Sequence, residues 1–157
     1  MIKLTKSRRT AGLAFLLANV AATLCLALPM LVADYGGSYY YVRGWDMVTG
    51  RQVPTDKFGM VPQLQVALTL LAVVLSLAVY FIRNKAKSVF LSALLNLFAL
   101  IVFLYMFVLR DGSAARFDPI RAAVHTGSIR YGFPVMSVVL LLAFLLSAYR
   151  AVRCREL

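Results

Sequence analysis

Acidic residues and histidine are scarce in this sequence of 157 residues, which has 6 Asp and Glu, 17 Lys and Arg, and one histidine. A single histidine, His125, cannot supply the paired axial ligands of an intramembrane haem. The sequence has only two cysteines, Cys25 and Cys154, so together with this histidine it lacks the four ligands of a conventional zinc site. The sequence therefore predicts no metal and no other cofactor.

Charge is also absent from four long apolar stretches, and 62% of the chain is hydrophobic, against roughly 45–50% in soluble domains. The stretches cover residues 11–33, 60–82, 88–109 and 133–149. A helix that crosses the hydrocarbon layer needs about 20 apolar residues, and the first stretch is longer than the apolar part of a typical signal peptide. The last is shorter, and we expect Arg150 and Arg153 to snorkel from its end. The sequence predicts an all-α membrane protein, a single domain built as a four-transmembrane-helix bundle.

The charges between these stretches predict the orientation. The two termini and the linker between the second and third stretches hold ten cations and one acid, Glu156, whereas residues 34–59 and 110–132 hold seven cations and five acids. Because cytoplasmic segments carry the excess of Lys and Arg, we expect both termini in the cytoplasm and residues 34–59 and 110–132 outside, in a cell (inner) membrane. The net charge of +11 then matches anionic lipid headgroups, and we expect the lipid bilayer rather than nucleic acid as the partner.

Uncharged polar residues recur within the apolar stretches. Asn19 and Asn96 occupy equivalent positions in the first and third stretches, so we expect their amides at one depth, where they meet. Two stripes accompany them at helical spacing: Ser88, Ser92 and Asn96 in the third stretch, and Gln65, Thr69, Ala72 and Ser76 in the second. Such groups either hold helices together by hydrogen bonds, at roughly 0.6 kcal/mol each on average, or line a path for a substrate.

A ridge of small side chains runs along the first stretch at spacings of three and four. It consists of Ala11, Ala14, Ala18, Ala21 and Cys25. Small residues let another helix approach closely, so we interpret the ridge as a packing surface for a helix of this chain or of another.

The two outer loops contain the residues best suited to contact a partner. The first has a run of three tyrosines and a tryptophan between glycines, and the second has cations and the histidine. We select Tyr39, Tyr40, Tyr41, Trp45, Asp46, Arg116, Arg121 and His125. Residues 39–42 and 126–131 favour strands, so we expect the two loops to pair as a small β-element, and Asp118 with Pro119 predicts a helix start. The alternative role for Tyr35 and Trp45 is an aromatic belt at the bilayer surface.

The order of these features resembles that of a known group. A basic N-terminus, a first span ending in proline, a loop with Gly-Trp-Asp-Met-Val-Thr-Gly at 44–50, a basic turn between two spans, and Tyr-Gly-Phe at 131–133 resemble a loose group of small, functionally uncharacterised bacterial four-transmembrane proteins. In outline the chain also looks like a claudin. Claudins carry a cysteine pair in the first outer loop, whereas no cysteine follows Trp45 until Cys154. The resemblance implies the shape of a bundle and no activity.

These residues are compatible with three different functions. The first, which we favour, is a non-enzymatic membrane protein that acts by helix and loop contacts, as an accessory or assembly subunit of a membrane complex or as a self-associating bundle. The second is a small transport or lipid-binding protein with a polar groove around Asn19, Asn96 and Gln65. The third is an enzyme acting on lipid at the outer surface with His125, Asp118 and Asp111, but no serine or cysteine motif surrounds that histidine.

Overall fold

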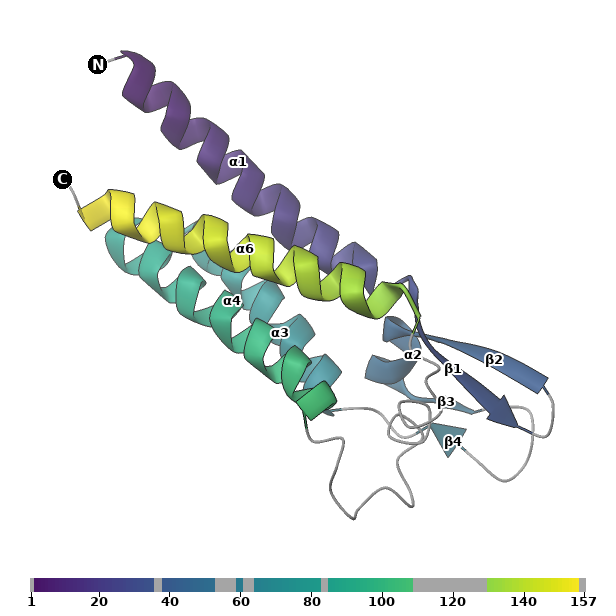
Figure 1. Cartoon of the computed structure of the whole chain (residues 1–157). Coiled ribbons are helices and arrows are strands. Elements are labelled where there is room, and N and C mark those ends of the chain that lie inside the picture. The colour runs from purple at the N-terminus through teal and green to yellow at the C-terminus, as the bar shows by residue number, and fades with distance from the viewer. Residues whose placement is uncertain are drawn as a thin grey trace.

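The computed structural model describes residues 2–35, 38–52, 59–60, 64–82, 85–108 and 130–155, and they are mostly helical. Four long helices form the body: α1 (Ile2–Cys25), α3 (Leu64–Tyr80), α4 (Lys85–Val108) and α6 (Gly132–Arg155). A short helix, α2 (Gly44–Thr49), and all the strands lie at one end of the body, and both chain termini lie at the other (Figure 1). We call these the strand end and the terminal end.

The long helices pack around a common core. α3 packs against α4, α4 against α6, α6 against α1 and α1 against α3, so α1 and α4 lie on opposite sides of the bundle. Its fully buried side chains include Phe15, Leu26, Met30, Met47, Phe103 and Leu140. Near the strand end, Phe103 of α4 stacks on Phe133 of α6 with ring centroids 4.4 Å apart. The outward faces are also apolar, since Leu17 is 61% exposed and Val138 is 56% exposed.

Two helices are long and apolar enough to cross a membrane: the segments Lys87–Tyr105 of α4 and Gly132–Arg153 of α6. α1 and α3 contain shorter apolar helical segments, Thr10–Cys25 and Leu64–Tyr80. The predicted helical character is therefore confirmed, together with two helices that meet the criteria for a membrane span.

The first helix is shorter than the sequence indicated. The first apolar stretch runs to Ala33, but α1 ends at Cys25. Leu26, Ala27 and Leu28 form a turn in which each backbone N–H donates to the carbonyl three residues earlier. Pro29 follows, has no N–H to donate and begins strand β1 (Pro29–Tyr35). The prediction of helix up to Ala33 is wrong because hydropathy alone does not distinguish an apolar helix from an apolar strand.

Two small sheets occur among the described residues. β1 pairs antiparallel with β2 (Ser38–Arg43), with Val32 opposite Tyr41, and β3 (Arg51–Gln52) pairs with β4 (Gly59–Met60). Both sheets form within residues 29–60, and most of the second strand in the expected pairing between the two outer loops lies outside the described residues. Strands close in sequence pair with little loss of chain entropy.

The described end of the second loop makes one backbone hydrogen bond to β1. Arg130 N–H donates to the carbonyl of Met30 at 2.9 Å, but Arg130 and Tyr131 belong to no strand. The rest of the predicted strand, residues 126–129, and the expected helix start at Asp118 lie outside the described residues.

Candidate functional site

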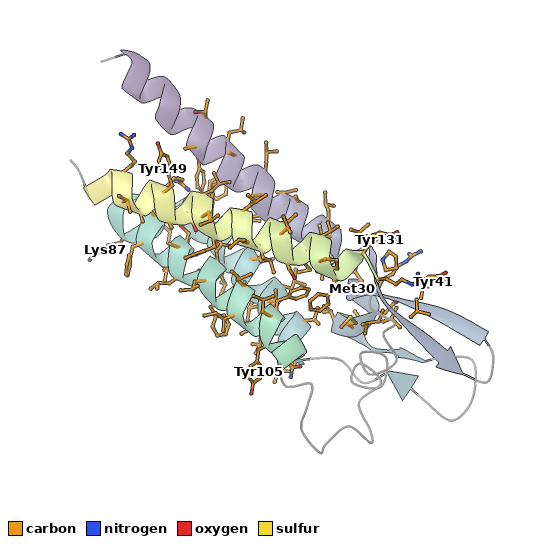
Figure 2. All side chains as sticks on the ribbon, in the orientation of Figure 1. Met30, Tyr41, Lys87, Tyr105, Tyr131 and Tyr149 are labelled. Carbon is orange, nitrogen blue, oxygen red and sulfur yellow. The ribbon has the colours of Figure 1, made fainter. Side chains whose placement is uncertain are left out.

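Exposed aromatic side chains gather at the strand end. Tyr41 of β2 is 56% exposed, Trp45 of α2 is 40% exposed, and Tyr131, which precedes α6, is 59% exposed. The guanidinium of Arg130 lies over the Tyr41 ring, 5.6 Å from its centroid. Figure 2 shows Tyr41 and Tyr131 at this same end. We call Tyr41, Trp45, Arg130 and Tyr131 the outer aromatic surface.

Helix α2 is fixed to the bundle at several points. The Trp45 N–H donates to the carbonyl of Leu26 at 3.0 Å, and Met47 is fully buried in the core. Asp46 Oδ2 accepts the Arg43 N–H at 3.0 Å, which caps the start of α2. An acid there also interacts favourably with the helix dipole. The sequence suggested Asp46 as a contact for a partner. In the structure Asp46 instead stabilises the start of α2, the helix that contains Trp45.

Two glycines allow this end to pack closely. A Cβ atom at Gly44 would lie 2.7 Å from Leu26 Cδ2 and 2.9 Å from Leu26 Cα, and one at Gly132 would lie 2.6 Å from the carbonyl oxygen of Pro29. A side chain at either position would therefore push α2 or α6 away from the turn that follows α1. The backbone beneath the outer aromatic surface is fixed by contacts that only glycine permits.

The polar stripes of α3 and α4 face each other inside the bundle. Asn96 Nδ2 donates to Ser76 Oγ at 2.9 Å, and Ser76 Oγ donates to the carbonyl of Ser92 at 3.4 Å. Ser88 Oγ donates to the carbonyl of Val79 at 2.5 Å. Gln65 is half-buried, and its backbone carbonyl accepts the Thr69 hydroxyl at 2.8 Å. The bonds of Ser76, Ser88 and Asn96 join α3 to α4 in the half of the hairpin nearer the terminal end, whereas the Thr69 bond lies within α3.

Asn19 is fully buried but bonds within its own helix. Its Nδ2 donates to the carbonyl of Phe15 at 2.9 Å. The Asn96 amide donates to Ser76 of α3, and neither amide oxygen accepts a hydrogen bond from a described residue, so no direct hydrogen bond joins the two amides that the sequence suggested would meet. The reason is the arrangement of the bundle, which puts α1 and α4 on opposite sides.

The packing face of α1 lies one residue beyond the predicted ridge. Ala11, Ala14, Ala18 and Ala21 are half-buried and Cys25 is buried. The described buried face of α1 consists of Gly12, Phe15, Asn19, Ala22 and Cys25, and the buried Leu26 follows in the turn. At Gly12 an added Cβ would lie 2.9 Å from the Tyr80 hydroxyl, so α3 approaches α1 at this glycine.

Sequence reasoning missed a cluster at the terminal end. The guanidinium carbon of Arg150 lies 4.8 Å from the ring centroid of Phe15 and 4.8 Å from that of Tyr80. We expected Arg150 to snorkel toward the aqueous surface, because arginines at the end of a span usually do. No sequence signal distinguishes that role from an aromatic contact between helices, although the aromatic Tyr80 at the same end of α3 was available as a candidate partner.

Several predicted site residues have no described side chain. Tyr39 and Tyr40 belong to β2, opposite Asp34 and Ala33, but only their backbone is described. Arg116, Arg121 and His125 lie outside the described residues, as do Asp111 and Asp118. Among the described residues no three His, Cys, Asp or Glu side chains gather in a metal-binding group.

Comparisons with protein-family models, with curated proteins and with solved structures found no match.

Proposed function

We propose that this protein is a non-enzymatic, four-span protein of the cell (inner) membrane that acts through its outer aromatic surface. In this role it is an accessory or assembly subunit of a membrane complex, or it associates with further copies of itself. The observation that carries the proposal is the exposure of Tyr41, Trp45 and Tyr131 on a backbone held in place by buried and capped contacts.

The four-span arrangement rests on the apolar segments and the charges at their ends. Besides the two helices long enough to cross, α1 and α3 supply apolar segments that pack against them. In α1 the apolar sequence continues past the helix into β1, where Met30, Leu31 and Val32 are buried. The terminal end carries the cations of both termini and of the α3–α4 linker, and by the positive-inside rule this charge supports a cytoplasmic position for that end.

A rigid aromatic surface is suited to binding another protein. Tyr, Trp and Arg are enriched where interface side chains contribute most to affinity. A surface that is ordered before binding loses less conformational entropy when the complex forms. Trp45 has both properties, because its helix is capped by Asp46 and its backbone N–H is bonded to Leu26. Arg130 above the Tyr41 ring adds a cation to the same surface.

The test compares complexes recovered in a gentle detergent from cells that produce the wild type or the double variant Tyr41→Ala, Trp45→Ala. We expect the wild type to recover a stoichiometric partner subunit, or to run as a homo-oligomer, and the double variant to lose it while keeping its helical circular dichroism. Leu145→Ala is the matched control, because Leu145 is exposed on the outside of α6, far from the strand end. Equal recovery from the double variant would contradict the proposal and would favour a belt role at the bilayer surface.

A second function is favoured by the buried amides of α1 and α4. In this alternative the protein binds or carries a lipid or small solute in a polar groove that includes Asn19, Asn96 and Gln65. Asn19 and Asn96 are fully buried, and each has a side-chain oxygen that accepts no hydrogen bond from the described residues. A lipid or solute that co-purifies with the wild type and is lost in Asn96→Leu would support this function over the first.

A further inference from the structure

Three buried polar residues from three helices lie in one layer of the bundle. Phe15 of α1 stacks on Tyr80 of α3, and the two helices run in opposite directions (Figure 1). Asn19 follows Phe15 by about one helical turn and Ser76 precedes Tyr80 by about one turn, so both are displaced from the stacked rings toward the strand end. Asn96 of α4 belongs to the same layer, because its Nδ2 donates to Ser76 Oγ at 2.9 Å.

Two acceptors in this layer are unsatisfied. Oδ1 of Asn19 and Oδ1 of Asn96 are buried, and neither accepts a hydrogen bond from a described residue. Both side chains are 0% exposed. A buried carbonyl oxygen without a donor is unfavourable, and the hydrocarbon of a membrane offers it none.

The surroundings of the layer favour a small, neutral donor. One turn further toward the strand end the buried residues include Ala22, Ala72 and Ala99, each with a single methyl group, beside the larger Val73 and Leu100. Toward the terminal end the layer is bounded by the stacked rings of Phe15 and Tyr80. Asp46, the one acid whose side chain is described, belongs to the strand end, so no described carboxylate is placed to balance a bound cation.

We propose that Asn19 and Asn96 bind a water molecule between them, which donates one hydrogen bond to each Oδ1. Buried waters typically satisfy two to four polar groups that the protein leaves unpaired, and here two acceptors are present at one level. The water connects α1 to α4, which lie on opposite sides of the bundle and share no direct amide bond. The bound water lies at the depth of the apolar segments. The proposal does not depend on whether the outer aromatic surface binds a partner.

The test uses the full-length protein, labelled with ¹⁵N, in detergent micelles. Nuclear Overhauser experiments in the laboratory and rotating frames distinguish a bound water from proton exchange by the sign of the cross-peak. We expect the side-chain amides of both Asn19 and Asn96 to show cross-relaxation with water. In Asn19→Leu the water cross-peak of Asn96 should fall to the noise. In the control Ser137→Ala it should persist, because the half-buried Ser137 hydroxyl bonds to the carbonyl of Phe133 near the strand end of α6, away from this layer.

Three results would overturn the proposal. The first is the absence of any water cross-relaxation at the two amides of the wild type, a measurement that does not depend on any variant folding. The second is a direct cross-peak between the two amides with none to water, which would mean that they contact each other. The third is a shift of both amide resonances that saturates on titration with NaCl or KCl but not with choline chloride, which would assign a monovalent cation to the layer.

Discussion

Phe15 of α1 and Tyr80 of α3 stack with their ring centroids 5.7 Å apart and their planes 19° apart, and the Arg150 guanidinium of α6 lies 4.8 Å from each centroid. Three helices that are distant in sequence therefore meet at the terminal end. A guanidinium over an aromatic ring contributes about 0.5 kcal/mol when exposed and about 2 kcal/mol when desolvated. Because Arg150 is half-buried and contacts two rings, we attribute to it a substantial share of the attachment of α1.

Arg150→Gln should loosen this end of the bundle. We expect a loss of about 1–2 kcal/mol in the free energy of unfolding, since both ring contacts of the cation disappear. The measurement is reversible unfolding in mixed micelles, followed by circular dichroism. Arg153→Gln is the control, because Arg153 is exposed and lies 5.6 Å from the centroid of the exposed Tyr149. Equal losses in the two variants would show that general charge, and not the aromatic contact, is responsible.

The close approach of α6 to the turn after α1 gives a second prediction. Gly132→Ala puts a Cβ 2.6 Å from the Pro29 carbonyl oxygen, and backbone at both sides must move. We expect the unfolding free energy to fall by about 1–3 kcal/mol, as in other overpacked cores.

Gly12→Ala provides the matched comparison for Gly132→Ala. Its nearest obstacle is the Tyr80 hydroxyl, at the end of a side chain, and alanine is favoured over glycine inside a helix by about 1 kcal/mol. The Gly12 variant should therefore lose less stability than the Gly132 variant. The opposite order in thermal unfolding would refute this account of the two glycines.

Ser76 provides a third prediction, on the α3–α4 hairpin. Ser76→Ala removes the acceptor of the Asn96 amide and the donor to Ser92, so we expect a loss of about 0.6 to 1.7 kcal/mol, the range from average to largest for hydrogen bonds between membrane helices. Ser147→Ala should cost less, because the Ser147 hydroxyl bonds to Phe144 within one helix. Double-mutant cycles with Asn96→Ala should show coupling for Ser76 and none for Ser147.

Hydropathy located the apolar helices, but it did not identify which residues contact each other. The alternation of apolar and charged segments located both ends of α3 and α4 to within about four residues, because each segment is bounded by charge or by Pro and Gly, but α6 continues to Arg155, past the predicted end at residue 149. It failed after Cys25, where apolar residues leave the helix at Pro29 and continue as a strand. It also placed the packing ridge of α1 on the alanines, one residue from the face that includes Gly12 and Phe15. Contacts such as Arg150 with Phe15 depend on the tertiary arrangement of three helices, and no local pattern specifies them.

The orientation in the membrane gives the last prediction. If the terminal end is cytoplasmic, alkaline phosphatase fused after Leu157 should be inactive, because the enzyme matures only outside the cytoplasm, whereas a fusion at Gly50, between α2 and β3, should be active. Green fluorescent protein, which does not fluoresce when exported unfolded, should give the reverse pattern at the two sites.

The physical basis of this orientation is the ten cations and single acid of the termini and the α3–α4 linker. Replacing Lys3, Lys6, Arg8 and Arg9 with Gln should weaken that preference and raise phosphatase activity at Leu157, with Ser7→Gln as the neutral control. An active phosphatase at Leu157 in the wild type would mean that the chain has an odd number of spans or the opposite orientation, and would place the outer aromatic surface on the wrong side for the proposed contacts.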